Sequence, residues 1–414
     1  MRQIIVHGKI YPLTTPIPPR RGLEMAKQTI IDDGAVVIEQ GIIEAIGPTN
    51  QILAEFGHQP TLVDAKGSIV IPGFVDCHTH LPFAGWRADE YRQRLMGRTY
   101  QDLGKLGGIA RSSQQFHESP DEDIVAFCES LIHEMLFNGT TTIEMKSGYG
   151  LSVAGELRQL RLIQELRHRV EQRTVSTGLF LHTPPPNLPK DRWLIKVLDE
   201  LLPQAHQLQW IDAVDAFVES TAFSVHEVGE FLREAQKLNL NIRVHSDQFS
   251  HLGGTAMALN LRARGIDHLD HIHSHDLAPF EASPSVAVLL PGATYSMGHK
   301  PHPPARKMID HNIAIAIASD FNPGTSPISS MPLIISMAVH FFGLSPEEAL
   351  SASTINAAYV LGVDHEVGSL EVGKRADVLI LDTDTLDSIP YRAGHNPVRQ
   401  LFVHGRLVTI NPSS

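Results

Sequence analysis

Hydrophobic and polar positions divide the chain into two β-rich ends and an alternating middle. The first seventy residues contain short apolar stretches separated by Gly, Asp and Pro, which is typical of strands joined by turns. The last fifty residues repeat this pattern. Neither end is long enough to form an independent sandwich. We therefore predict a small β-sandwich domain built from residues 1–70 and 364–414, with residues 71–363 inserted between its two parts.

The middle of the chain alternates buried strand-like runs with helical patterns such as 124–139 and 224–239. Eight strands separated by helices predict an α/β fold, a (β/α)8 TIM-like barrel, over 71–363. An open doubly wound sheet is the alternative. It is weakened because no G-x-G-x-x-G follows a first strand and no Walker motif occurs. The eight runs are 69–80, 140–147, 174–182, 213–219, 240–246, 265–271, 286–292 and 313–320.

Polar side chains stand at the ends of these runs, where a barrel of this type carries its chemistry. The first run ends in His78 and His80, which share a face if the strand continues that far, because alternate residues point the same way. The fifth run reaches His245 and the eighth reaches Asp320. Three imidazoles and one carboxylate suit a divalent cation with an open position for water. Such a cation lowers the pKa of bound water to about 7.

Other histidines near these ends have less defined roles. His268, in the sixth run, has no ligand duty in this scheme and is free to orient water or to stabilise charge on a substrate oxygen. A buried structural histidine is the alternative for this residue. His271, His273 and His275 follow it in a passage from strand to loop, and we interpret all three as structural or solvated.

Composition argues against some kinds of binding partner and favours one cellular compartment. The net charge of −12 argues against binding to nucleic acid or to an anionic membrane, because both favour a basic face. The two cysteines, Cys77 and Cys128, cannot build a disulfide framework, which favours the reducing cytoplasm. The N-terminal residues do not have the pattern of a signal peptide. No apolar run approaches the roughly 20 residues that span a bilayer.

Six segments together resemble a known family. They are VDCHTHLPFAGWR, EMKSGYGL, VHSDQFSHLGG, DHLDH, LLPGATY and SDFNPGTSP, and in this order they are similar to the imidazolonepropionases, a family of metal-dependent amidohydrolases. The His-x-His pair marks only the superfamily, whereas FAGWR, KSGYGL and DFNPGTSP are more specific. The resemblance covers nearly the whole chain, including the split β-domain.

The resemblance implies hydrolysis of the cyclic amide of 4-imidazolone-5-propanoate to N-formimidoyl-L-glutamate, a step of histidine degradation. It implies one Zn²⁺ or Fe ion per subunit, a cytoplasmic homodimer and catalytic assistance from His268. The metal ligands carried over by motif are His78, His80, His245 and Asp320. The substrate-binding residues carried over are Arg87, Tyr149, His182, Asn322, Gly324 and Thr325.

One pocket position modifies the expected mechanism. Gln248 stands where some relatives carry Glu, and an amide cannot take a proton. We therefore assign Gln248 to binding the substrate ring and leave proton transfer to Asp320 and His268. The sequence leaves open which of these two is the principal base, and which metal is native.

Two other functions remain possible on sequence alone. A related amidohydrolase that deaminates a heterocyclic ring would share the ligands but would not need Arg87, whose guanidinium matches a carboxylate. A barrel without catalysis is disfavoured because all four ligands are present. We also expect residues 295–308 to form a loop over the pocket, with Arg306 attracting the anionic substrate and with His299 and His302 solvated.

Overall fold

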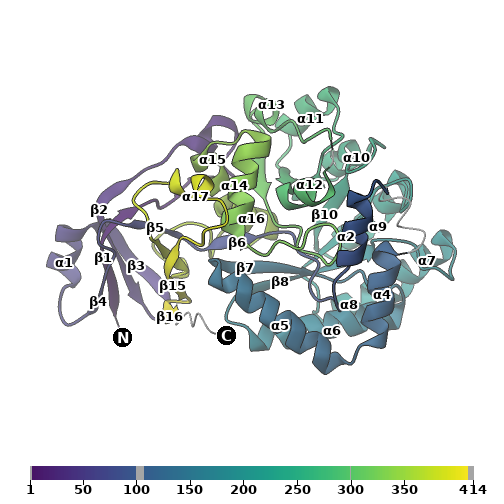
Figure 1. Cartoon of the computed structure of the whole chain (residues 1–414), viewed down its shortest axis with the longest axis horizontal. Coiled ribbons are helices and arrows are strands. Elements are labelled where there is room, and N and C mark those ends of the chain that lie inside the picture. The colour runs from purple at the N-terminus through teal and green to yellow at the C-terminus, as the bar shows by residue number, and fades with distance from the viewer. Residues whose placement is uncertain (1, 99–106, 299, 409–414) are drawn as a thin grey trace.

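The two chain ends form one branched sheet at one end of the molecule, drawn in purple and yellow in Figure 1. The computed structural model describes residues 2–98, 107–298 and 300–408. The strand order β16-β15-β14-β5-β1-β2-β3 interleaves both ends, and β1 also pairs with β4. The strands are β1 (Gln3–Ile10), β2 (Ile31–Glu39), β3 (Ile42–Pro48), β4 (Thr61–Asp64), β5 (Ile69–Pro72), β14 (Val378–Leu381), β15 (Val398–Val403) and β16 (Arg406–Val408).

Residues from both chain ends share one core within this sheet. Ile5 and Val36 from the N-terminal part pack in the same buried cluster as Val378 and Phe402 from the C-terminal part. The predicted partnership of the two ends is therefore confirmed. The domain boundaries after residues 70 and 363 stay predictions.

Eight parallel strands form a nearly closed barrel in the order β6 to β13, which confirms the predicted fold class. Strands such as β12 and β13 are buried along their whole length, as expected where helices cover a parallel sheet. The barrel strands are β6 (Phe74–Asp76), β7 (Thr140–Lys146), β8 (Arg173–Leu181), β9 (Ala213–Ala216), β10 (Asn241–Ser246), β11 (Gly265–His268), β12 (Val286–Leu289) and β13 (Ala314–Ile317).

The first predicted strand, 69–80, is divided at Gly73. Its first part is β5 of the terminal sheet, and its second part is β6 of the barrel. A side chain at Gly73 would lie 2.1 Å from the Thr141 hydroxyl, so only glycine fits this passage between the two sheets. The strand assignment was therefore wrong for His78 and His80, which lie in the segment after β6.

The barrel closes where its first and last strands end. Thr79 and Phe321 form an isolated parallel bridge, and the amide of His80 donates to the carbonyl of Phe321 at 2.9 Å. Among the described residues, no ladder longer than this single bridge joins the ends of the sheet at β6 and β13. The closure therefore lies beside the segments that carry His78, His80 and Asp320.

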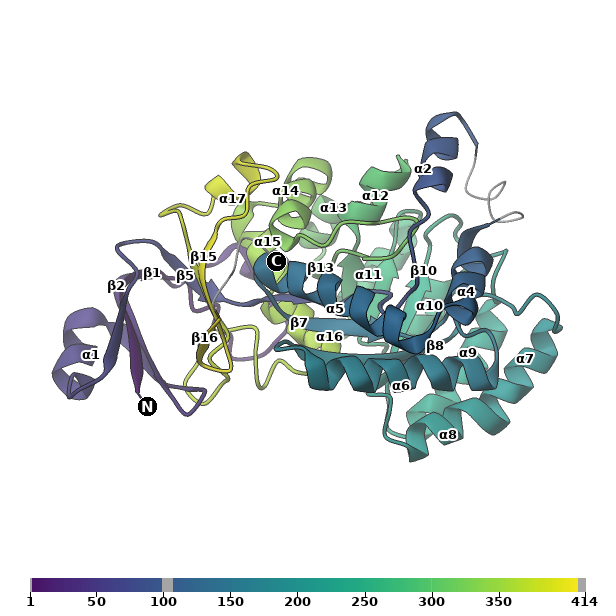
Figure 2. The ribbon, with the colours of Figure 1, turned by 60° about the horizontal axis from the view of Figure 1, so that its bottom comes forward.

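Helices surround the barrel, as the two views in Figures 1 and 2 show. Helix α9 illustrates why these segments are helical: its N-terminus has a reciprocal capping box between Ser224 and Glu227, and one face is buried. The α-helices are α1 (Thr49–Phe56), α2 (Ala88–Leu95), α4 (Gly108–Glu118), α5 (Asp121–Phe137), α6 (Val153–Arg169), α7 (Lys190–Lys196), α8 (Leu202–Gln207), α9 (Val225–Lys237), α10 (Gly254–Asn260), α11 (Leu277–Glu281), α12 (Pro291–Met297), α13 (Ala305–Asp310), α14 (Met331–Phe342), α15 (Pro346–Ala352), α16 (Ile355–Leu361) and α17 (Ser388–Tyr391). Shorter helical turns are η1 (Gly22–Ala26), η2 (Val197–Leu201) and η3 (Ser274–Asp276). No described helix is both long enough and apolar enough to cross a membrane.

Helices α12 and α13 cover the two ends of the expected loop, residues 295–297 and 305–308, and the described residues between them, 298 and 300–304, form no helix or strand. Arg306 does not line the central cavity described below; its guanidinium pairs with the buried carboxylate of Glu348. Glu348 also forms the capping box of α15, so the carboxylate is fixed in place. The role predicted for Arg306 was therefore wrong. His302 is partly buried, and His299 lies outside the described residues.

Candidate metal centre and substrate pocket

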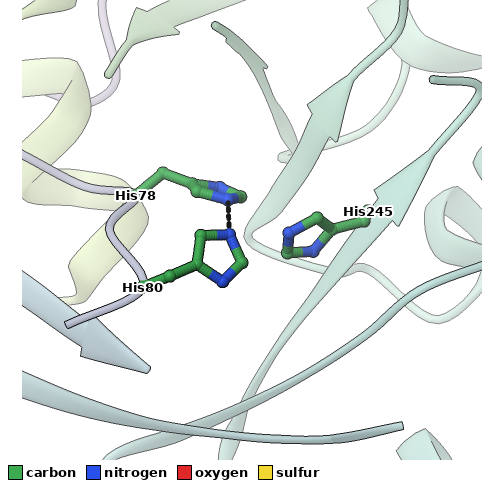
Figure 3. A group of neighbouring side chains, drawn as sticks. All are labelled: His78, His80 and His245. Atoms are coloured by element: carbon green, nitrogen blue, oxygen red, sulfur yellow. Dashed lines mark hydrogen bonds between the residues drawn. The ribbon is translucent and has the colours of Figure 1, made fainter. Parts of the chain in front are cut away.

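Three histidines from two distant segments converge at the mouth of the barrel (Figure 3). His78, His80 and His245 each offer a ring nitrogen, and these nitrogens all lie within 4.8 Å of one another. The two Nε2 atoms of His78 and His80 are 3.3 Å apart. Oδ1 of Asp320 lies 3.1 Å from Nε2 of His80 and 3.5 Å from Nε2 of His78. The structure thus brings together the four residues that the sequence predicted as ligands.

The chemistry of this cluster fits a divalent cation. Burial lowers the pKa of His78 and His80 well below the ordinary value, so both rings are neutral and keep a lone pair for a metal. Nε2 of His245 is buried and has no hydrogen-bond partner among the described residues. Buried polar atoms without partners are costly, and a cation would satisfy this one.

Buried carboxylates hold two of these rings from behind. Nδ1 of His78 lies 2.8 Å from Oδ2 of Asp267, and Nδ1 of His245 lies 3.0 Å from Oδ2 of Asp215. A carboxylate at Nδ1 fixes the tautomer and directs Nε2 toward a metal. Neither aspartate was identified from the sequence.

Two buried cations balance the carboxylates below the cluster. Arg243 contacts both Asp267 and Glu144, with Nη1 2.6 Å from Glu144. Lys146 lies 2.8 Å from Glu144 and 2.6 Å from Asp215. Glu144 and Lys146 therefore lie inside the barrel, beneath the site, where every charge has an opposite partner.

His268 and Asp320 lie at the same mouth with altered acidity. Burial lowers the pKa of His268 to about 3, so its ring is neutral. Burial raises the pKa of Asp320 above its ordinary value, which makes this carboxylate a better proton acceptor. Both residues have left-handed backbone angles, with φ of 78° at His268 and 53° at Asp320. Such conformations in non-glycine residues concentrate at functional sites.

A cavity adjoins the cluster, and the empty space in and in front of it, open solvent included, is about 410 Å³. It contains most of the predicted substrate-binding side chains, and Ile109 and Phe217 add apolar walls that the sequence analysis had not singled out. The lining residues are His80, Arg87, Ile109, Tyr149, His182, Phe217, His245, Gln248, His268, Asp320, Asn322 and Thr325.

Arg87 is a buried cation whose hydrogen-bonding capacity is largely unused. Its side chain is 3% exposed, and neither Nε nor Nη1 has a hydrogen-bond partner among the described residues. One oxygen of Glu90 lies 3.7 Å from Nη1, too far for a hydrogen bond. Gly324 lies against the guanidinium rather than on the cavity wall, since an added Cβ would be 1.7 Å from Nη2. This arrangement leaves Nε and Nη1 of the guanidinium without hydrogen bonds among the described residues, so they can bind an anion in the cavity.

Comparison with known proteins shows the family to which this chain belongs. Residues 69–408 match the model of the amidohydrolase family. The imidazolonepropionase of Symbiobacterium thermophilum is 41% identical over 396 residues, which cover 94% of this chain and 93% of that protein. The chain belongs to the imidazolonepropionase family of amidohydrolases. The imidazolonepropionase of Acinetobacter baumannii is 38% identical, with 93% of this chain and 96% of that protein covered.

Solved structures with little sequence identity to this chain share its fold. An adenosine deaminase from Xanthomonas campestris with bound zinc superposes with a TM-score of 0.72 at 17% identity, covering 98% of this chain and 92% of that one. At this identity the likeness establishes the barrel and its terminal sheet only. As an amidohydrolase, the chain is a metal-dependent hydrolase, in agreement with the histidine cluster.

Not every pocket residue of this imidazolonepropionase-family chain is free for a ligand. The side-chain oxygen Oδ1 of Asn322 accepts from the backbone amides of Gly324 and Thr325 at 2.9 and 2.7 Å, and its Nδ2 donates to the backbone carbonyl of Asp320. Asn322 therefore shapes the loop after β13 as well as lining the cavity. Nδ1 of His182 donates to the carbonyl of Gly148 at 3.0 Å, which leaves Nε2 as an acceptor.

Gln159 of this family member has a supporting role that its sequence does not reveal. This fully buried side chain accepts from the amides of Gly148 and Tyr149 at 3.1 and 2.9 Å and donates to the carbonyl of Pro82 at 2.8 Å. It thereby ties the KSGYGL segment to the segment after His80. A single glutamine on a helix gives no sequence signal for this role, because its partners are set by the packing of α6 against the barrel.

Proposed function

We propose that this chain hydrolyses the cyclic amide bond of 4-imidazolone-5-propanoate and forms N-formimidoyl-L-glutamate in histidine degradation. The observation that carries the proposal is Arg87, a buried and incompletely paired guanidinium in the cavity that adjoins the histidine cluster. On a chain of net charge −12, such a cation is a specific feature that favours an anionic substrate. A propanoate carboxylate bound at Arg87 would leave the imidazolone ring beside the cluster.

His78, His80, His245 and Asp320 would hold one divalent ion per chain, and we propose Zn²⁺ or Fe²⁺ because three nitrogens and one oxygen suit either. Bound there, the ion supplies Lewis acidity at the ring carbonyl and lowers the pKa of a water molecule to about 7. Asp267 and Asp215 hold the rings of His78 and His245 in the required tautomer.

Proton transfer is assigned to Asp320. The raised pKa of its carboxylate suits it to take a proton from the attacking water and to give it to the leaving ring nitrogen. The carbonyl carbon gains a C–O bond and loses its C–N bond, so the ring opens to a carboxylate and a formimidoyl amine. The neutral ring of His268 donates a hydrogen bond to the developing oxyanion.

The remaining pocket residues are assigned to the ring and the chain of the substrate. Nε2 of His182 accepts from a ring N–H, since Nδ1 is already bound to Gly148. The Gln248 amide can both donate and accept at the ring, which suits a lactam with both kinds of group. The Tyr149 hydroxyl and Thr325 hydroxyl complete the polar lining.

The test is an ultraviolet assay of imidazolone consumption by the purified chain, before and after chelation. We expect turnover that is lost when the metal is removed and restored by Zn²⁺ or Fe²⁺. Mass spectrometry should identify the product as N-formimidoyl-L-glutamate. Metal analysis of the active chain identifies the ion. Deamination of a heterocyclic base by the metal-loaded chain, with imidazolone left unconsumed, would replace this proposal with the deaminase alternative.

We also propose a cytoplasmic homodimer without nucleic-acid or membrane partners. The two free, buried thiols of Cys77 and Cys128 support the compartment, and the acidic net charge argues against the two excluded kinds of partner. Light scattering on a sizing column measures the assembly directly. A monomer mass would contradict the homodimer.

A further inference from the structure

A second histidine cluster lies outside the catalytic site, on the segments that follow β10 and β11. His251, His273 and His275 each offer a ring nitrogen, and these nitrogens lie within 4.8 Å of one another. The rings of His251 and His273 stack with centroids 3.8 Å apart, and the His275 ring is edge-on to both. His251 is partly buried, whereas His273 and His275 are exposed.

Two buried carboxylates lie behind His251. Its Nδ1 is 3.4 Å from Oδ1 of Asp247 and 3.8 Å from Oδ2 of Asp276. Asp247 and Asp276 are only 1% and 3% exposed, and each of these two oxygens is buried without a hydrogen-bond partner among the described residues. Buried anionic oxygens without donors are costly unless a positive charge compensates them.

The surrounding backbone holds this cluster in place. The amide of His271 donates to the carbonyl of Asp247 at 2.7 Å, and the amide of Asp276 donates to the carbonyl of His273 at 3.0 Å. The Thr255 hydroxyl donates to Oδ2 of Asp247 at 2.6 Å, which leaves Oδ1 directed toward His251. Asp247 itself has a left-handed φ of 55°, a conformation that its environment must maintain.

We propose that His251, His273 and His275 bind a second divalent transition-metal ion of the zinc class. Asp247 and Asp276 lie 3.4 and 3.8 Å from Nδ1 of His251, on the side of the ring that leaves Nε2 for the ion. The exposed rings of His273 and His275 would turn from their present contacts toward the ion, and water would complete its shell. This replaces the interpretation of His273 and His275 as solvated residues.

Charge and donor type select the ion. Imidazole nitrogens suit zinc, copper or nickel, whereas calcium and magnesium require mostly oxygen ligands. The two carboxylates supply the negative charge that a dication needs. The site is separate from the residues assigned to hydrolysis, because neither His273 nor His275 lines the catalytic cavity.

The test is a zinc titration of the full, untagged and metal-stripped chain against a chromophoric chelator. The informative variant is His273→Ala with His275→Ala, since both side chains are exposed and their loss leaves the core intact. The matched control is His206→Ala with His226→Ala, which removes two exposed histidines from helices α8 and α9.

We expect two zinc equivalents per chain in the wild type and in the control, and one in the informative variant, which keeps its hydrolytic rate. Cobalt(II) added to the half-loaded wild type should give visible absorption bands that the informative variant lacks. One equivalent in the wild type, or two in the informative variant, would overturn the proposal. Because hydrolysis is measured in the same samples, failure of this site is distinguishable from failure of the proposed function.

Discussion

Gly324→Ala tests whether the position of Arg87 determines substrate binding. The added Cβ would lie 1.7 Å from Nη2 and 2.2 Å from Cζ of Arg87, whereas non-bonded atoms settle near about 3.5 Å. Gly324 has no left-handed φ, so alanine fits its backbone and the guanidinium must move instead. Hydrogen bonds to charged groups contribute about 1.5–3 kcal/mol, so we expect kcat/KM to fall by roughly 10- to 150-fold.

The assay is steady-state imidazolone hydrolysis with the metal content measured in the same sample. The loss should appear mainly in KM, and it should disappear for an imidazolone that lacks the propanoate carboxylate. Gly47→Ala is the matched control, because its added Cβ meets no atom closer than 3.7 Å. A folded, metal-loaded Gly324→Ala chain with kcat/KM within twofold of the wild type would refute the role given to Arg87.

Three further substitutions test buried charged residues around the site. Asp267→Asn removes the carboxylate that holds His78, so the affinity for the metal should fall about 10- to 100-fold when it is measured by competition with a chelator. Asp33→Asn changes an exposed Asp–His pair and is the control, which should leave the affinity unchanged. Lys146→Met leaves two buried carboxylates short of a cation and should lower the free energy of unfolding in urea by about 3–5 kcal/mol; a loss below 1 kcal/mol would contradict the buried network. Burial raises the pKa of Glu156 from its ordinary 4.5 to about 7, so the folded chain keeps a proton that the unfolded chain releases. Stability should therefore fall as the pH rises from about 4.5 to 7, by up to about 1.4 kcal/mol per pH unit, and Glu156→Gln should flatten that slope in urea titrations.

Features that depend on local pattern could be predicted from the sequence. The eight barrel strands are apolar runs bounded by polar residues and turns, so their approximate positions follow from burial alone. The ligands His78, His80, His245 and Asp320 stand at or just beyond the ends of such runs, and parallel strands bring those ends to one mouth. Local pattern and barrel geometry therefore suffice for this part of the site.

Features that depend on distant packing could not be predicted. The run from residue 69 to 80 is continuously apolar at its start, and nothing local reveals that Gly73 passes between two sheets. The partners of Arg243 come from other strands and are set by how the barrel closes. Arg306 has a charge that could serve an anion, but its pairing with Glu348 depends on where α13 meets α15.

The predicted metal ligands lie on both sides of the seam where the segments after β6 and β13 meet, so binding of a metal there would also affect closure of the barrel. His78 and His80 follow β6 on one side of this seam, and Asp320 follows β13 on the other. A cation bound by these side chains would join the two sides of the nearly closed barrel at the point where its backbone pairs through the isolated Thr79–Phe321 bridge. Binding of the catalytic ion and closure of the barrel would then stabilise each other. Hydrogen exchange of the His80 amide, which donates to the Phe321 carbonyl, would report whether this closure is intact.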